Sequence, residues 1–353
     1  MSTGSAIARD DRLPAEVGRR ARLELVFGFR DGRTVLVDSY AEPPLRVGRC
    51  FENGRGLHLI LASSAPGIFG GDAIRQTIRL EPGAIVTLTS QSATQLHPAQ
   101  SGAVAVIDSR YDVADGAELS CNWDPMIPFA GACIEQRIDI TVASGGRLTW
   151  SDAMMGGRAG RGERWQFRIF DHQLRLFRSG TLSYLERYRL DPSTACLSHP
   201  WAAADAAYIG TLLRAGHGDS GAVADLLHTA LAGLEEVRGS ADVLDRDLLL
   251  ARIAAAGGVA FRRARQALAE TLPSDEAGQN RYLTPAPKRP TLRESFPMMW
   301  STLRSASMPT WSVTRKLAPP PSVSAMFVFV YSTSVGPGRI GIVLTSPIDA
   351  SRS

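Results

Sequence analysis

A loose internal repeat in the middle of the chain constrains its fold more than any other feature. Three segments each read as a strand, a glycine turn and a second strand, and their turn glycines, Gly83, Gly116 and Gly146, recur at intervals of roughly 30 residues. Such a period is typical of stacked supersecondary units that cannot bury their apolar faces alone. We therefore expect a mainly β fold, a β-helical, solenoid-like stack of strands; an ordinary sandwich of β-hairpins is the alternative. The three copies are IRQTIRLEPGAIVTLTS (74–90), IDSRYDVADGAELSCNW (107–123) and IDITVASGGRLTWSD (138–152).

Alternation of apolar and polar residues supports the strands. Ile74 and Ile78 alternate with Arg75 and Arg79, and the same pattern recurs in 134–142. A period of two places one face of a strand against a core and the other in water. The predicted strands are 21–27, 33–40, 57–62, 73–80, 84–90, 103–113, 117–123, 134–142, 147–152, 165–170, 173–178 and 181–190.

Each repeat unit ends in a long loop. These loops are 91–102, 124–133 and 153–164. If the units stack, all three loops emerge on one side of the body, and loops on a rigid scaffold are frequent sites of function. That side is the predicted working surface.

The hydrophobic period changes to that of a helix after Trp201. Leu227, Leu231 and Leu234 follow helical spacing, as do Leu244 and Leu248. The spacing predicts a small α-helical part near 201–271, with helices over about 220–238 and 241–271.

Composition changes again near Leu272. The segment 273–353 holds 11 of the 21 prolines, 13 serines and both lysines, with nine Lys and Arg against four Asp and Glu. Prolines interrupt both helices and sheet ladders, so we expect 273–353 to be a tail of low order. The expected organisation is a flexible N-terminus (1–20), a β-rich domain with closing helices (21–272) and this tail.

Charge and hydropathy exclude several classes of partner. The part of the chain before the tail, 1–272, holds 30 basic and 31 acidic groups, so nothing draws it to nucleic acid or an anionic membrane. No apolar run is long enough to span a membrane, there is no secretory signal, and the four cysteines form no CxxC. These features predict a cytoplasmic protein with reduced thiols.

The main catalytic motifs are also missing. A P-loop needs a lysine after its glycines, and the chain has no lysine before Lys288. The six histidines form no HxxxH or HExxH, so no zinc site is readable. The stretch 218–221 spells GDSG, but it lies between predicted helices, where Asp219 or Ser220 is expected to be an N-cap. The sequence therefore predicts that the protein is not an enzyme.

Two segments have residues suited to binding. Asp72 follows a flexible turn rich in glycine, and a carboxylate there can cap a turn or bind a metal ion. The loop GRAGRGER (157–164) contains Arg158, Arg161 and Arg164 around Glu163. Its arginines suit phosphate, solvent or acidic residues of a partner.

The order of these motifs resembles that of the UreD (UreH) family of urease accessory proteins. Singly each match is weak, but the ordered set, from about Ala21 to Thr271, is specific. The matching segments are Gly32–Thr34 (GRT), Pro44–Phe51 (PLR-x-x-R-x-F), Gly70–Asp72 (GGD), Thr89–Thr94 (TTQ-x-AT), Phe129–Ala132 (F-x-GA), Gly157–Glu163 (GR-x-x-RGE) and Glu186-Arg187 (ER).

The sequence departs from the family pattern in several places. Phe69 stands where valine is usual, and Gln95, His97 and Pro98 stand where the family has Lys-x-Tyr-Arg. The W-x-P-Q stretch is reduced to 123–126, and nothing after Leu272 matches the pattern. We therefore expect loop 91–102 to lack the basic contacts that it makes in relatives.

The resemblance implies a urease maturation factor in the cytoplasm. Such proteins are non-enzymatic scaffolds or chaperones that join the urease apoprotein to UreF and UreG and help deliver nickel to the urease active site. No cofactor is expected to bind tightly, and Ni²⁺ would bind only in transit, with Asp72 and Glu163 as candidate ligands because transit needs ligands that release the ion. The expected partner-binding residues are Arg158, Arg161, Arg164, Gln91, Thr94 and Phe129.

A second function stays open. A β-solenoid can be a polysaccharide-binding or lyase protein, and the arginines of loop 158–164 would then bind an acidic sugar. The missing secretion signal and the low aromatic content of 7% count against this alternative, since sugar sites need stacking rings.

Overall fold

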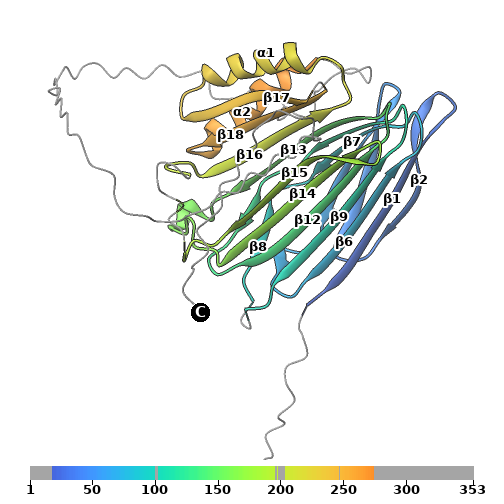
Figure 1. Ribbon diagram of the computed structural model, residues 1–353. Coiled ribbons are helices and arrows are strands. Elements are labelled where there is room, and N and C mark those ends of the chain that lie inside the picture. Colours follow the sequence, from blue (N-terminus) through green and yellow to red (C-terminus); the bar gives the residue numbers. More distant parts are fainter. Residues whose placement is uncertain (1–17, 100–101, 195–196, 198–202, 246, 274–353) are drawn as a thin grey trace, which may run out of the picture.

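The repeat units stack as parallel strands in two sheets that face each other (Figure 1). The computed structural model describes residues 18–99, 102–194, 197, 203–245 and 247–273. A seven-stranded sheet has the order β15-β14-β12-β9-β6-β1-β2, and an eleven-stranded sheet has the order β17-β18-β16-β13-β10-β7-β4-β3, with β5, β8 and β11 beside this path. The predicted tail after Pro273 and most of the predicted N-terminal segment lie outside the described residues.

The strands of the seven-stranded sheet are β15 (Thr181–Leu190), β14 (Ile169–Arg178), β12 (Cys133–Val142), β9 (Ala105–Val113), β6 (Ala73–Leu80), β1 (Arg20–Arg30) and β2 (Arg33–Ala41). Those of the eleven-stranded sheet are β17 (Val237–Asp245), β18 (Leu248–Ala255), β16 (Tyr208–Ala215), β13 (Arg147–Met155), β10 (Glu118–Asn122), β7 (Ile85–Ser90), β4 (Gly56–Ser63), β3 (Leu45–Asn53), β5 (Ile68–Phe69), β8 (Thr94–His97) and β11 (Met126–Pro128).

The chain winds from one sheet to the other and back, which makes a solenoid-like stack of about four turns. β6, β9, β12 and β14 pair in parallel in one sheet, and β4, β7, β10 and β13 pair in parallel in the other. Gly83 and Gly116 turn the chain between the sheets with φ of 77° and 66°, values that suit glycine. The predicted β-solenoid is confirmed, and the sandwich of hairpins is wrong because hairpins pair antiparallel.

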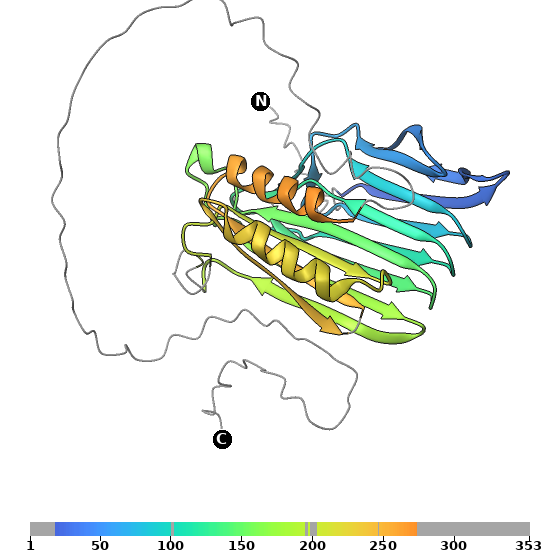
Figure 2. The ribbon, with the colours of Figure 1, turned by 90° about the horizontal axis from the view of Figure 1, so that it is seen from above.

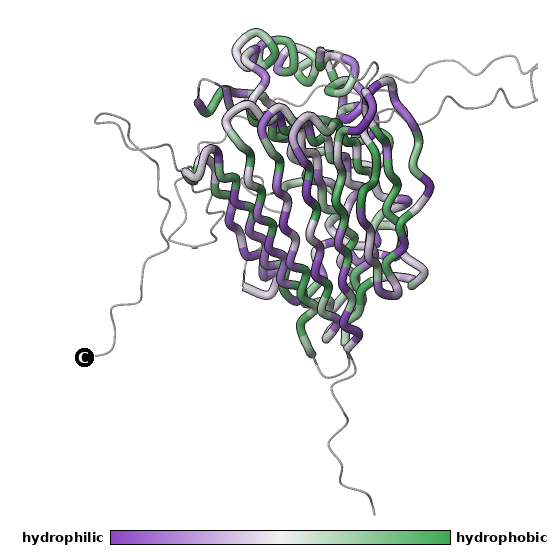
Figure 3. The backbone as a smooth tube through the Cα atoms, turned by 90° about the vertical axis from the view of Figure 1, so that its right-hand side faces the viewer, coloured by the Kyte–Doolittle hydropathy of each residue, from purple (hydrophilic) through white to green (hydrophobic). Residues whose placement is uncertain are grey.

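The predicted alternation is seen along these strands. In β6, Ile74, Ile78 and Leu80 are buried, whereas Arg75 and Arg79 are exposed. Figure 3 shows the same alternation of apolar and polar residues along neighbouring strands. The inward residues form two apolar clusters between the sheets: one includes Leu25, Leu88 and Ile140, and the other includes Ile74, Ile107 and Ile134.

A helical layer covers part of the eleven-stranded sheet. α1 (Ser220–Ala232) and α2 (Gly258–Thr271) lie over its strands in Figure 2, and their apolar faces pack on β16 and β18. Neither described helix is long and apolar enough to cross a membrane. Asp219 is the N-cap residue of α1, as predicted, but its carboxylate binds Arg214 instead of a backbone N–H.

The predicted helices were wrong in the segment between α1 and α2. Residues 237–245 and 248–255 form β17 and β18 and not parts of two long helices. In β18, Leu248 and Leu250 face the core between the sheets, while Leu249 and Ala251 face the helical layer. A strand buried on both faces is apolar throughout, so its sequence also fits helical spacing.

Candidate functional site

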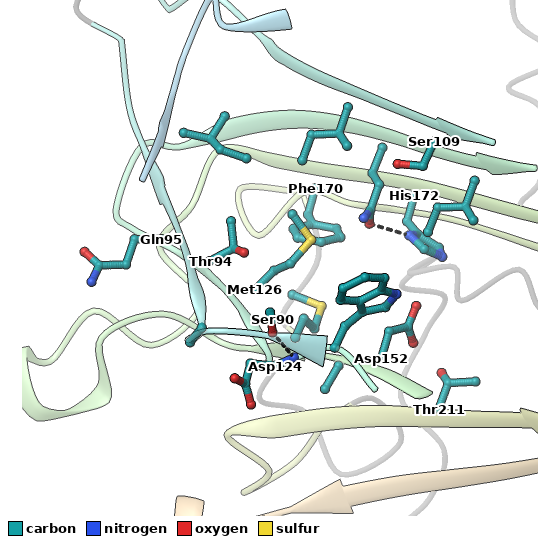
Figure 4. A pocket seen from close by; sticks show the side chains of 18 of the residues that line it. Ser90, Thr94, Gln95, Ser109, Asp124, Met126, Asp152, Phe170, His172 and Thr211 are labelled. Atoms are coloured by element: carbon teal, nitrogen blue, oxygen red, sulfur yellow. Dashed lines mark hydrogen bonds between the residues drawn. The ribbon is translucent and has the colours of Figure 1, made fainter. Parts of the chain in front are cut away.

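A cavity of about 1010 Å³ lies between the two sheets (Figure 4). Pro44 and Leu45, at the start of β3, line one part of it, and Gly239 and Ser240 of β17 line another. The cavity therefore extends along the stack from β3 and β4 to β17 and β18. Its apolar lining includes Trp123, Met126, Trp150, Met154, Phe170 and Ile253.

Two rows of polar side chains face this cavity. Asp152, Thr211 and Arg252 are register partners on β13, β16 and β18. Gln136 and His172 are register partners on β12 and β14 of the opposite sheet. Figure 4 shows Asp152 between His172 and Thr211, with Asp124 farther away.

The polar groups of these rows are held by hydrogen bonds. Trp150 Nε1 donates to Asp152 Oδ2 at 3.0 Å, and His172 Nδ1 lies 2.9 Å from Gln136 Oε1. Burial raises the pKa of the Asp152 carboxyl, and the nearby His172 only partly offsets this. Asp152 therefore holds its proton at higher pH than an exposed aspartate.

The far part of the cavity wall contains a buried ion pair. Arg252 Nη1 lies 2.7 Å from Glu186 Oε1 and 2.8 Å from Thr211 Oγ1. Arg252 Nη2 and Glu186 Oε2 both bond to the hydroxyl of Tyr184, each at 2.9 Å. Burial alone would raise the pKa of Glu186, but Arg252 and the hydrogen bonds outweigh it and keep this pKa below its ordinary value.

The three predicted loops meet on one side of the stack, as the repeat indicated. Two of them contain short strands, since β8 lies in loop 91–102 and β11 lies in loop 124–133. β8 pairs in parallel with both β5 and β11. Phe69 and His97 are register partners, and their rings stack at 4.4 Å between centroids. His97 also meets the edge of Phe129 at 4.6 Å. Neighbouring strands are about 4.8 Å apart, which suits the contact distance of aromatic rings.

An arginine lies at each end of this row of rings. The guanidinium carbon of Arg19 is 5.4 Å from the centroid of Phe69, and that of Arg158 is 3.9 Å from the centroid of Phe129. We call Arg19, Phe69, His97, Phe129 and Arg158 the aromatic ladder. It joins residues from five parts of the sequence into one continuous contact.

Asp72 and Glu163, the predicted nickel ligands, bind the two arginines of the ladder. Asp72 Oδ2 lies 2.6 Å from Arg19 Nη2 and accepts the backbone N–H of Phe69 at 2.9 Å. Burial would raise the pKa of Asp72, but these contacts lower it overall. Arg158 donates to both oxygens of Glu163 and is the main cause of its lowered pKa. Each carboxylate is thus held in an ion pair.

The predicted partner-binding residues separate into two groups. Phe129 and Arg158 belong to the ladder, and Arg161 and Arg164 are exposed on the same loop. Gln91 and Thr94 line the cavity instead. Two departures from the family pattern, Phe69 and His97, contact each other directly.

Sequence reasoning missed the polar rows of the cavity. Asp152, His172 and Arg252 are polar residues at inward positions of otherwise apolar strands, and that pattern was the available signal. Within the ranges that the structure describes, no group of three or more His, Cys, Asp or Glu side chains is placed to hold a metal ion.

Comparison with known proteins agrees with the motifs. The sequence profile of the family described as UreD urease accessory protein matches residues 19–306. The match continues past the domain boundary predicted near Leu272.

Three curated relatives illustrate the similarity. The urease accessory protein UreD of Anaeromyxobacter sp. is 30% identical over 267 residues, which are 73% of this chain and 88% of the relative. UreD 2 of Streptomyces griseus is 32% identical over 252 residues, 66% of this chain and 81% of the relative. UreD of Sorangium cellulosum is 34% identical over 180 residues, 51% of this chain, and this alignment spans only 57% of the relative. The chain belongs to the UreD urease accessory protein family.

Proposed function

We propose that this chain is a urease maturation factor, a non-enzymatic scaffold that joins the urease apoprotein to UreF and UreG and helps deliver Ni²⁺. Membership in the UreD family supports a role in urease maturation. The observation that carries the transfer step is the cavity, which extends along the stack from β3 and β4 to β17 and β18. Such a cavity offers an ion a route through the body of the scaffold.

The chemistry of the lining suits a travelling ion. Asp124, Asp152 and His172 offer carboxylate oxygen and imidazole nitrogen, and imidazole is a good ligand for nickel. Burial raises the pKa of the Asp152 carboxyl, so protons compete with a cation for it at higher pH than at an exposed aspartate. Transfer through the cavity is therefore expected to slow as pH falls.

Asp72 and Glu163 stay predicted nickel ligands. Each is held by an arginine, so a metal ion would have to displace Arg19 or Arg158 before it could bind. Asp72→Asn and Glu163→Gln test this role separately from that of the cavity.

The scaffold role is tested by co-expression. Urease subunits, UreF and UreG are produced with or without this chain, and the nickel content and activity of purified urease are measured. We expect nickel-poor, inactive urease when the chain is omitted. Equal nickel content in both preparations would contradict the proposed function.

The cavity route is tested by removing its ligating groups. The double variant Asp152→Asn/His172→Gln keeps hydrogen-bonding side chains of similar shape, and Asp108→Asn, on the exposed face of β9, is the matched control. We expect lower nickel content in urease with the double variant, although the complex still forms. Nickel content equal to that of the control would exclude the cavity from the route and leave the scaffold role standing.

A further inference from the structure

The loop that follows the aromatic ladder presents arginines without carboxylate partners. Arg161, Arg164 and Arg168 are exposed. In the described part of the chain, Arg164 donates only to the backbone oxygen of Asp205, and Arg168 only to that of Gly102. Among the described residues, no carboxylate lies within ion-pair distance of these three guanidinium groups. Their positive charge is therefore available to a partner.

The outer face of the seven-stranded sheet differs in this respect. Arg75 and Arg79 are also exposed, but in the register of the sheet they lie beside Asp108 and Asp112 of the neighbouring strand. Charges of both signs alternate on that face, as on an ordinary solvated surface. The loop face, in contrast, has three arginines with no described carboxylate within ion-pair distance.

Exposed apolar side chains lie near Arg168, whose guanidinium donates to the carbonyl of Gly102, two residues before Val104. Phe69 is 36% exposed and Val104 is 41% exposed. The two are close in the fold, because Gly71 donates its N–H to the carbonyl of Val104 at 3.1 Å. A ligand of this face therefore gains from an apolar side chain as well as from negative charge.

The face is held rigid by contacts between the loops. The ladder connects Phe69, His97 and Phe129, and Gly131 donates to the carbonyl of Gln166 at 2.9 Å. Glu163 accepts from Arg158 at 2.7 Å, and its other oxygen is bound too. A surface ordered before binding loses little entropy when a partner docks.

We infer that this loop face binds an extended acidic segment of a protein partner. The carboxylates of the segment bind Arg161, Arg164 and Arg168, and one apolar side chain packs on Phe69 and Val104. The arginines lie in one loop, between β13 and β14, whereas Phe69 and Val104 belong to earlier turns of the stack. Neighbouring strands of the stack are about 4.8 Å apart, so an extended segment that runs across the strands can reach both groups. The inference rests on the proposed function in that it assigns a surface to one of the partners of the scaffold.

The test measures binding of labelled peptides by fluorescence anisotropy. The full chain is titrated against a ten-residue peptide of glutamates with one central phenylalanine, and against versions with a central alanine or with lysines. We expect the Glu–Phe peptide to bind and the lysine peptide not to bind. Affinity should fall with added salt, because exposed charges are screened.

Matched variants locate the binding surface. The triple variant Arg161→Glu/Arg164→Glu/Arg168→Glu should lower the affinity for the Glu–Phe peptide by about tenfold or more, because its new glutamates repel those of the peptide. The control Arg75→Glu/Arg79→Glu/Arg110→Glu removes the same charge from the sheet face and should retain the affinity of the wild type. Phe69→Ala should abolish the preference for phenylalanine over alanine in the peptide. Circular dichroism checks that each variant is folded.

The outcomes separate this inference from the proposed function. Equal weakening by both triple variants, or no binding of the Glu–Phe peptide, overturns the acidic-segment surface. Tighter binding of a heparin fragment to the same arginines also overturns it and favours an acidic sugar. None of these results changes the co-expression test, and failure of that test with intact peptide binding removes the maturation role but not the surface.

Discussion

Glu186 of β15 and Arg252 of β18 form an ion pair across the end of the stack, with 2.7 Å between Oε1 and Nη1. Only 4% of the Glu186 side chain is exposed. The pair joins the two sheets where the cavity reaches its last strands. A buried carboxylate that keeps its charge depends on its partner, so this contact is a sensitive point of the fold.

Loss of Arg252 should be costly. Arg252→Met leaves the buried Glu186 carboxyl without its cationic partner, and we expect the free energy of unfolding to fall by about 3–5 kcal/mol. Arg175→Met is the matched control: Arg175 binds Asp139 but is 40% exposed, and exposed pairs contribute about 1 kcal/mol or less. Urea denaturation of both variants measures the difference. Equal losses of unfolding free energy in the two variants would show that burial does not increase the contribution of the Glu186–Arg252 pair to stability.

The same pair predicts a dependence on pH. The pKa of Glu186 is lowered in the folded state, so its contribution to stability is present above the unfolded pKa of about 4.3 and is lost as pH falls through the folded value. The difference in unfolding free energy between wild type and Arg252→Met should therefore be largest near neutral pH. It should shrink below about pH 4. A constant difference from pH 7 to pH 3 would contradict the charged state of Glu186.

The architecture was predictable because its signals were local. Gly83 and Gly116 marked the turns, and the alternation around Ile74 and Arg75 marked a half-buried strand. β18 was misread because it is buried on both sides, which removes the alternation that identifies a strand. β8 and β11 were missed because strands of four and three residues are too short to show a period.

The candidate site was predictable only in part. The arginine loop stood out by composition, and the repeat predicted that its loop and that of Phe129 lie on one side. The contact between Arg158 and Phe129 itself was not predicted. The contact between Phe69 and His97 depends on the register of β5 and β8, which no sequence pattern specified. The cavity depends on the spacing of the two sheets. The position of Asp152 and His172 in its lining could therefore be seen only in the folded structure.

Gly157 should be essential to the arginine loop. Its φ is 108°, and an added Cβ would lie 2.1 Å from the backbone oxygen of Glu163. Gly157→Ala should therefore displace Glu163 from Arg158 and make the loop sensitive to protease. Gly160→Ala is the control, because nothing lies within 4 Å of its added Cβ and its φ is not positive. Limited proteolysis compares the two, and equal cleavage rates would show that Gly157 does not fix the loop.

His217 should destabilise the protein in mild acid. Burial and the nearby Arg214 lower the pKa of His217 to about 4, against about 6.5 in the unfolded chain. The unfolded state therefore binds more protons between these values, and stability falls as pH decreases from about 6.5 to 4. His217→Gln should remove about 2 kcal/mol of this loss, since each pKa unit corresponds to 1.36 kcal/mol and the ring is only half-buried. NMR titration of the His217 ring, with a midpoint near 6.5, would contradict the prediction.

The core should be stable without the residues after Pro273. Leu272 is buried and packs with α1 and α2, so it belongs to the apolar cluster of the helical layer. A chain ended after Pro273 keeps this contact and should melt within about 1 °C of the full chain. A chain ended after Glu270 loses Leu272, a buried large side chain whose removal costs about 2–5 kcal/mol, and should melt several degrees lower. The family profile extends to residue 306, so a third chain ended there is the control. If the chain that ends after Pro273 has a lower melting temperature than this control, residues between 274 and 306 contribute to the stable fold.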